Sequence, residues 1–165
     1  MPKIAVESAA FDDIDREILR VLENDGRATV VEVAKAVALS QNATADRIRR
    51  LIHAGVISGF AAEISAEALG LRLQAYVDVK LRSECPADDF ERRLDGVPGL
   101  IECVLTTGSF DYMLRVACRD QNDLVRVAEF LRTTAGAAET YSRIILRERR
   151  FPMTASFDSP RQTGR

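Results

Sequence analysis

Apolar residues recur at helical spacing in three separate runs over the first third of the chain. The first run follows Asp12 and forms one stripe: Ile14, Ile18, Leu19 and Leu22. Asp12 or Asp13 can cap the start of this helix. We expect it to end at residues 24–26, Asn-Asp-Gly, where the glycine can adopt a positive φ.

Two shorter helices are predicted next. One face of the second is apolar: Val30, Val33, Ala34 and Val37. Ser40 is a good N-cap for the third helix, and Gly55 is placed to end it. Its expected inward stripe has Thr44 near the edge and consists of Ile48, Leu51 and Ile52. Three helices with a short last connection predict a helix-turn-helix, and we expect residues 56–64 to form a small β-wing.

After a connector at residues 65–70, the period of the pattern changes from helical to two. The odd positions from Leu71 to Leu81 are all apolar, and the even positions are polar or amphipathic. This alternation predicts a half-buried strand. Pro86 then opens a helix whose apolar residues are Phe90, Leu94 and Val97.

The second half of the chain completes a β-α-β-β-α-β order. Strands are predicted at residues 100–108 and 111–118, followed by a helix marked by Leu124, Val127, Ala128 and Leu131 and by a last strand at residues 140–150. This is the split βαβ pattern. We therefore expect an α+β protein with a winged helix-turn-helix domain at residues 1–64, a ferredoxin-like domain at 71–151 and a flexible tail at 152–165.

Composition and charge exclude several classes of protein. The formal net charge of −2 excludes a uniformly basic nucleic-acid coat, but not a local basic patch. No apolar run is long enough to span a membrane, and the N-terminus lacks a secretory signal. Three cysteines without CxxC spacing and a single histidine make a metal site improbable, so we expect no metal. A reducing cytoplasm suits this composition.

The third helix is the candidate DNA-binding element. Its predicted outer face is polar, and the N-terminal part of this helix enters the major groove in helix-turn-helix proteins. The candidate contacts are Ser40, Gln41, Asn42, Arg47, Arg49 and Arg50. We expect Gln41, Asn42 and Arg47 to contact bases or their flanking phosphates, and Arg49 and Arg50 mainly to hold phosphates.

The DNA-binding third is not basic as a whole. Acidic residues slightly outnumber basic ones over the first sixty positions, with the acids concentrated in the first helix and the arginines in the third. Because affinity for DNA scales with the number of phosphates neutralised, a single copy should bind weakly at cellular salt. We therefore expect several copies to bind together.

Four stretches of the sequence resemble the Lrp/AsnC, or feast/famine, transcriptional regulators. They lie at residues 12–40, 47–60, 100–116 and 142–146. The third is the most specific, because the family carries a Gly-x-x-Asp-Tyr element at this strand-turn-strand. Here it reads Gly108, Ser109, Phe110, Asp111 and Tyr112.

The resemblance implies a DNA-binding winged helix-turn-helix and a C-terminal RAM-type domain that pairs with its mate through the sheets. It implies homodimers that assemble further into tetramers or octamers on double-stranded DNA. It also implies a small effector, commonly an amino acid, that binds near the Gly-x-x-Asp-Tyr loop and alters assembly or DNA affinity. No catalytic residue and no cofactor beyond this effector is expected.

The residues of this loop have chemistry that suits an amino acid. Gly108 can expose backbone N–H groups to a carboxylate, and Asp111 can accept from an ammonium group. The candidate effector-binding set is Thr106, Thr107, Gly108, Phe110, Asp111, Tyr112, Ser142 and Arg143. Arg143 stands where a small or apolar residue is expected near the effector pocket, which leaves three interpretations open: a changed ligand choice, an acidic effector, or a side chain that fills the pocket. The alternative is an ordinary β-turn in which Asp111 satisfies local backbone donors.

Two other functions compete with this interpretation. One is an effector sensor that has lost DNA binding, against which the polar outer face of the third helix argues. The other is an enzyme resembling the siroheme decarboxylases, which share this two-domain layout and depend on histidines near a tetrapyrrole. The single histidine, His53, lies in the predicted DNA-binding helix, which disfavours the enzyme.

Overall fold

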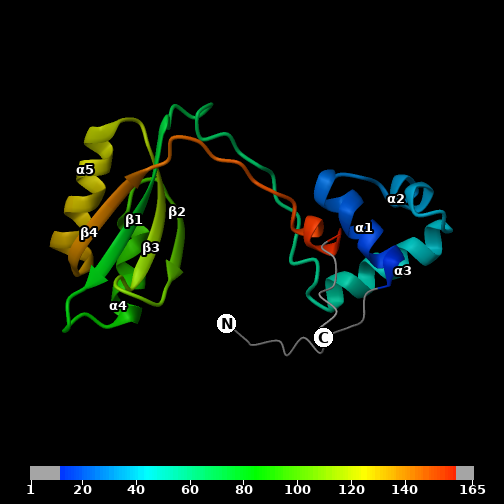
Figure 1. Cartoon of the computed structure of the whole chain (residues 1–165), viewed down its shortest axis with the longest axis horizontal. Coiled ribbons are helices and arrows are strands. Elements are labelled where there is room, and N and C mark those ends of the chain that lie inside the picture. The colour runs from blue at the N-terminus through cyan, green and yellow to red at the C-terminus, as the bar shows by residue number, and fades with distance from the viewer. Residues whose placement is uncertain (1–11, 159–165) are drawn as a thin grey trace, which may run out of the picture. The chain divides into compact units, whose positions relative to one another are not determined.

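The computed structural model describes residues 12–158, which form two compact units (Figure 1). The first unit extends to Glu63 and includes the C-terminal segment from Arg149. The second unit is Ile64–Glu148. Each unit has its own hydrophobic core, so each buries its apolar residues by itself.

The first unit contains the three predicted helices. They are α1 (Asp13–Asn24), α2 (Val30–Ala36) and α3 (Gln41–His53). Asp12 caps α1 by accepting the Asp15 N–H at 2.8 Å, and Ser40 caps α3. The start of α2 is a capping box between Thr29 and Glu32, in which each side chain accepts the other residue's backbone N–H.

The core of this unit is built from all three helices. Its buried apolar residues are Ile18, Leu22, Val33 and Leu51. The predicted inward stripe of α3 was wrong in one position, because Ile52 is 46% exposed while Thr44 is fully buried. Burial of Thr44 leaves no unsatisfied polar group, since its hydroxyl donates to the Ser40 carbonyl at 3.0 Å.

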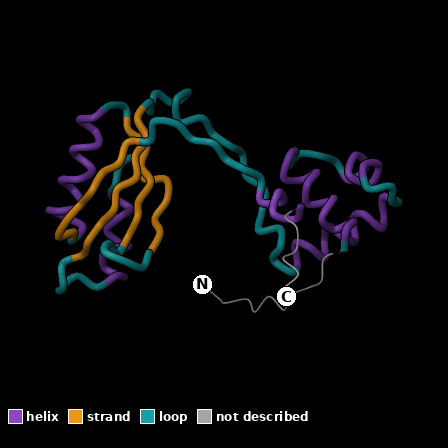
Figure 2. Tube along the Cα trace, viewed as in Figure 1, coloured by secondary structure: helices purple, strands orange, loops and turns teal. Residues whose placement is uncertain are grey.

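The expected β-wing is wrong, because residues 56–64 contain no strand (Figure 2). The backbone N–H groups of Val56 and Ile57 instead donate to the Leu51 carbonyl at the end of α3, at 2.9 and 3.2 Å. Gly55, with a φ of 70°, turns the chain for these bonds. Donors used to close the helix terminus are not available for a hairpin ladder.

The C-terminal segment contains one more short helix. A short 3₁₀-helix, η3 (Met153–Asp158), lies within the tail that was expected to be flexible. The Glu23 carboxylate of α1 accepts the backbone N–H groups of Met153 and Thr154, at 2.5 and 2.9 Å. The rest of the predicted tail, residues 159–165, lies outside the described residues.

The second unit is a four-stranded antiparallel sheet with the predicted element order. Its strands are β1 (Leu73–Leu81), β2 (Leu100–Leu105), β3 (Tyr112–Cys118) and β4 (Ala137–Ile144), in the spatial order β2-β3-β1-β4. The helices are α4 (Ala87–Arg93), which runs into the 3₁₀ turn η1 (Leu94–Gly96), and α5 (Gln121–Phe130), which runs into the π-helical turn η2 (Leu131–Ala135). The last strand starts three residues earlier than predicted and ends six residues earlier.

Both helices cover the same face of this sheet. Alternate residues of β1 and β3, including Val77 and Leu114, are fully buried against Phe90 of α4 and Val127 of α5. The period-two prediction for β1 is thereby confirmed. The intervening residues of β1, such as Tyr76, lie on the opposite face, which no helix of the described chain in this unit covers (Figure 1).

Gly99 is a position in the second unit where the backbone requires glycine. Its φ is 69°, and a Cβ added there would lie 2.0 Å from the carbonyl oxygen of Ala117. The Gly99 carbonyl itself accepts the Ala117 N–H at 2.8 Å, which holds the start of β2 against β3.

We predict that Gly99→Ala lowers the free energy of unfolding by about 3 kcal/mol or more, because the backbone must shift to remove this clash. Urea unfolding followed by circular dichroism measures the change. The matched control is Gly70→Ala, since Gly70 also has positive φ but its Cβ would meet no atom within 4 Å. Equal losses in the two variants would contradict a special role for the Ala117 contact.

Candidate nucleic-acid interface and effector loop

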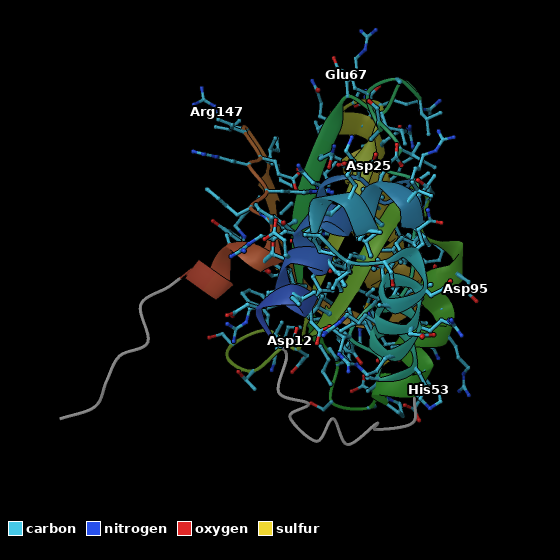
Figure 3. The ribbon with its side chains drawn as sticks, turned by 90° about the vertical axis from the view of Figure 1, so that its right-hand side faces the viewer. Asp12, Asp25, His53, Glu67, Asp95 and Arg147 are labelled. Carbon is cyan, nitrogen blue, oxygen red and sulfur yellow. The ribbon has the colours of Figure 1, made fainter. Side chains whose placement is uncertain are left out.

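The outward face of α3 is polar and open at its N-terminal end. Gln41, Asn42, Asp46, Arg49 and His53 are all exposed. Ser40 accepts the Ala43 N–H through its hydroxyl at 3.3 Å, which holds the helix start in place. Figure 3 labels His53 near the other end of this helix. The amides at the N-terminal turn are therefore free to meet base edges.

Arg47 does not lie on this open face. Its Nη1 donates to the carboxylates of Asp12, at 2.7 Å, and Asp15, at 2.8 Å, and its side chain is only 24% exposed. Hydrogen bonds to Asp12 and then Asp15 raise the pKa of Arg47. The pKa of Asp12 is lowered by the hydrogen bond from the Asp15 N–H and, to a smaller extent, by the one from Arg47. Figure 3 labels Asp12 at the start of α1. The predicted base or phosphate contact by Arg47 competes with this ion-pair network.

The other two arginines are more accessible. Arg50 donates through Nη2 to both oxygens of Asp15, at 2.9 and 2.7 Å, yet its side chain is 61% exposed. Arg49 pairs with Asp46 at 2.5 Å, and both side chains are largely exposed. Exposed pairs of this kind contribute little and exchange readily for other partners. Arg49 is thus available to a phosphate.

Asp15 is the residue that the sequence prediction missed. Its side chain is only 3% exposed although it carries a charge. The available signal was its spacing, because an acid three residues before Ile18 lies on the apolar side of α1. A buried carboxylate requires cationic partners, and α3 supplies two.

The loop between β2 and β3, residues 106–111, closes on itself. The Asp111 carbonyl accepts the Thr106 N–H at 2.8 Å, and the Thr106 hydroxyl donates to the Phe110 carbonyl at 3.2 Å. Gly108 has a φ of 119° and open space where a side chain would lie. Gly108 and the exposed Thr107 therefore form an open loop tip.

Asp111 fastens this loop to β1. Its Oδ1 accepts from Lys80 Nζ at 3.0 Å, its Oδ2 accepts the Leu81 N–H at 2.8 Å, and its own N–H donates to the Val79 carbonyl. The Leu81 N–H, and then Lys80, lower the pKa of the Asp111 carboxyl below its ordinary value. This geometry matches the alternative in which Asp111 satisfies local donors.

The remaining predicted effector residues do not converge in one chain. Tyr112 is buried in the core, and its hydroxyl donates to Glu91 of α4 at 2.7 Å. Ser142 pairs with Val77 and so lies on the helix-covered side of β4. On the other side, Arg143 donates to Asp78 at 2.8 Å and Phe110 stacks on Tyr141. The strand alternation that separates positions 142 and 143 prevents them from sharing one site.

A pocket of about 360 Å³ lies beside the loop within the second unit. Of the predicted effector residues, only Asp111 and Tyr112 line it. The other lining residues come from the end of β1, the segment after it, the first residue of α4 and the end of β2: Lys80, Leu81, Arg82, Ser83, Cys85, Ala87 and Leu105. No sequence pattern singles these residues out, because residues 82–86 have no periodicity and are marked only by following a predicted strand.

Two kinds of feature are absent from the described residues. No helix of residues 12–158 is long and apolar enough to cross a membrane. The same residues contain no group of three or more His, Cys, Asp or Glu side chains arranged to hold a metal ion.

We predict that Asp111→Asn lowers the thermal unfolding midpoint at neutral pH, because the amide cannot accept from both Lys80 and Leu81 as the carboxylate does. The lowered pKa means that the carboxylate stabilises the folded state above its unfolded pKa of about 4. This advantage is lost as the pH falls through the lower folded pKa. The gap between the two proteins should therefore shrink between about pH 5 and pH 3.

Thermal unfolding by circular dichroism across this pH range tests the prediction, with Asp95→Asn at an exposed position as the control. A gap that stays constant with pH, or that Asp95→Asn reproduces, would show that the Asp111 charge does not hold the loop.

Two family models match this chain. Residues 11–52 match the AsnC-type helix-turn-helix domain, and residues 74–152 match the Lrp/AsnC ligand binding domain. The transcriptional regulator LrpA of Mycobacterium tuberculosis is 38% identical over 137 residues, which cover 83% of this chain and 91% of that protein. The leucine-responsive regulatory protein of Escherichia coli is 31% identical over 141 residues, covering 84% and 86%.

Solved structures agree with these matches. A transcriptional regulator of Neisseria meningitidis in complex with L-Met superposes with a TM-score of 0.79 at 32% identity, covering 87% of this chain and 95% of its own. A feast or famine regulatory protein of M. tuberculosis complexed with L-methionine gives 0.76 at 37% identity, covering 84% and 94%. The matched regions cover both units of this chain, and the chain belongs to the Lrp/AsnC family of transcriptional regulators.

Proposed function

We propose that this chain is a sequence-specific, DNA-binding regulator of transcription that responds to an amino acid. The observation that carries the proposal is the open polar face at the N-terminal end of α3, held by the Ser40 cap. Gln41 and Asn42 present amide groups that can pair with base edges, and Arg49 can exchange Asp46 for a phosphate. This assignment favours DNA binding over a sensor that has lost it.

The proposed DNA-binding form contains at least two copies. One α3 offers few cations that are not already paired, so a single copy neutralises few phosphates. The helix-free face of the sheet provides a surface for a homodimer, with exposed Tyr141 beside half-buried Met113 and Tyr76. We further propose that these dimers assemble into tetramers or octamers, as is typical of the family. A two-fold dimer reads half-sites about one helical turn apart or a multiple of it.

The proposed effector site is the pocket beside the 106–111 loop. Lys80 and Arg82 can meet a carboxylate, while Leu81 and Leu105 can contact an apolar side chain. Asp111 keeps lone pairs that can accept from an ammonium group, although Lys80 and Leu81 already occupy both oxygens. Two relatives are complexed with L-methionine, which supports an amino acid as the effector class. Arg143 is not needed for this site, because it is paired with Asp78.

We predict that the wild-type protein binds DNA from upstream of its own gene more tightly than a scrambled duplex, with an affinity that falls as salt rises. Arg49→Ala should weaken binding to both duplexes alike and reduce the salt slope by about one, because one phosphate contact is lost. Fluorescence anisotropy at several salt concentrations measures both effects.

The matched control is Arg126→Ala on α5, since Arg126 pairs with Asp123 three residues away, as Arg49 does with Asp46. The control should leave affinity and slope unchanged. Absence of DNA binding by the wild type at low salt would refute the proposal that the chain is a DNA-binding regulator. The two alternatives, a sensor without DNA binding and a tetrapyrrole enzyme, would then be favoured. A bound tetrapyrrole would be visible as colour in the purified protein.

For the effector, we predict that L-methionine binds the wild type and that Arg82→Ala weakens this binding about tenfold, because a charge-assisted hydrogen bond is lost. Isothermal titration calorimetry measures the affinity, and L-glutamate tests the acidic class that Arg143 first indicated. Arg72→Ala, an exposed arginine just before β1, is the control. Unchanged affinity in Arg82→Ala would remove this pocket as the site.

A further inference from the structure

Asp15 is a buried charge that the proposed DNA contacts do not use. Its carboxylate is 97% buried yet accepts hydrogen bonds from two arginines of α3. It lies in the first turn of α1, and its own N–H donates to the cap residue Asp12 at 2.8 Å. The position of this carboxylate is therefore fixed by α1, and the arginine side chains of α3 that donate to it are fixed with it.

The two arginines use this carboxylate differently. Arg47 contributes only Nη1, but that atom is shared between Asp12 and Asp15, and the side chain is mostly covered. Arg50 contributes only Nη2, which faces both oxygens of Asp15. Among residues 12–158, the Nε and Nη1 of Arg50 have no hydrogen-bond partner, and the side chain is 61% exposed.

From this geometry, we infer that Asp15 is a positioning residue for DNA binding, which holds Arg50 through Nη2 of its guanidinium so that Nε or Nη1 meets a DNA phosphate. The inference rests on the proposed function. Arg47 then serves to neutralise and anchor the buried carboxylate, and Arg50 makes the contact.

The planar guanidinium suits such a bridge. Its five N–H donors lie on three nitrogens in one plane, so Nη2 can hold a carboxylate while Nε or Nη1 binds a phosphate. A long side chain that is already held loses less rotamer freedom when it meets its ligand. Asp15 therefore raises affinity without touching DNA. A lysine at position 50 has a single donor nitrogen, so the group that meets Asp15 is also the one that must meet the phosphate.

A purely structural role for Asp15 predicts a different result. In that case Asp15 only ties α1 to α3, and its loss weakens the fold and DNA binding by an amount that does not depend on Arg50. The positioning role predicts that Asp15 and Arg50 act as a unit. A double-mutant cycle separates the two, because it measures whether the effect of one substitution depends on the other.

The cycle compares the wild type, Asp15→Asn, Arg50→Ala and the double variant, each checked for folding by circular dichroism. Anisotropy with the upstream duplex at several salt concentrations gives affinity and salt slope. Arg50→Ala should weaken binding about tenfold in the wild-type background and reduce the slope by about 0.9. In the Asp15→Asn background it should cost about twofold or less. An equal fold-loss in both backgrounds overturns the inference.

Arg50→Lys decides the question if Asp15→Asn fails to fold, because it leaves Asp15 and the charge in place. On a logarithmic scale, the loss of DNA affinity in Arg50→Lys should be at least about half of the loss in Arg50→Ala. The control is Arg126→Lys on α5, which changes an exposed arginine outside the proposed DNA-binding face and should bind as the wild type does. Wild-type affinity in Arg50→Lys overturns the inference. A wild type that binds no duplex overturns the proposed function, and the role of Asp15 with it.

Discussion

A carboxylate removed from water must be met by hydrogen-bond donors, and this constraint organises the proposed DNA-binding part of the first unit. Burial of an ionised group costs several kcal/mol unless partners compensate it. In the first unit, Asp15 meets this requirement with Arg47 and Arg50, and the result joins α1 to the recognition helix. In the second unit, Asp111 is partly exposed, yet Lys80 and a backbone N–H hold its carboxylate in the same way, and the result joins the 106–111 loop to β1. Both contacts set the position of an element that we assign to ligand binding.

The same constraint limits how this protein can hold DNA. Each arginine of α3 already has an acidic partner, so the charge available to phosphates is smaller than the sequence implies. The net charge of −2 has the same consequence at longer range. Binding then depends on geometry and on the number of copies more than on bulk attraction. A regulator built in this way is sensitive to anything that alters its assembly, and the proposed effector pocket lies in the same unit as the proposed dimer surface.

The two faces of the sheet illustrate how one strand pattern serves two purposes. Alternate residues of β1 fill the core beneath α4 and α5, which secures the fold. The residues between them stay on the open face, where an Asp78–Arg143 ion pair lies near the stacked rings of Phe110 and Tyr141. The loop that lies beside the pocket thus also contributes an aromatic ring to the proposed dimer surface. A ligand that moves this loop would therefore also move a residue of the proposed dimer surface, and so could alter how copies of the chain assemble.

The sequence alone determined the architecture, because hydrophobic periodicity records which face each helix and strand buries. It predicted all three N-terminal helices, the Ser40 cap, the βαββαβ order and the family, which the comparisons confirm. It did not determine the partners of its charged side chains. That Arg47 turns toward Asp15, that Asp111 is held by Lys80, and that Ser142 and Arg143 lie on opposite sides of β4 all depend on residues more than thirty positions apart or on strand register. Periodicity reports burial along one element, whereas these pairings are decided by how separate elements pack, so only the tertiary structure could decide them.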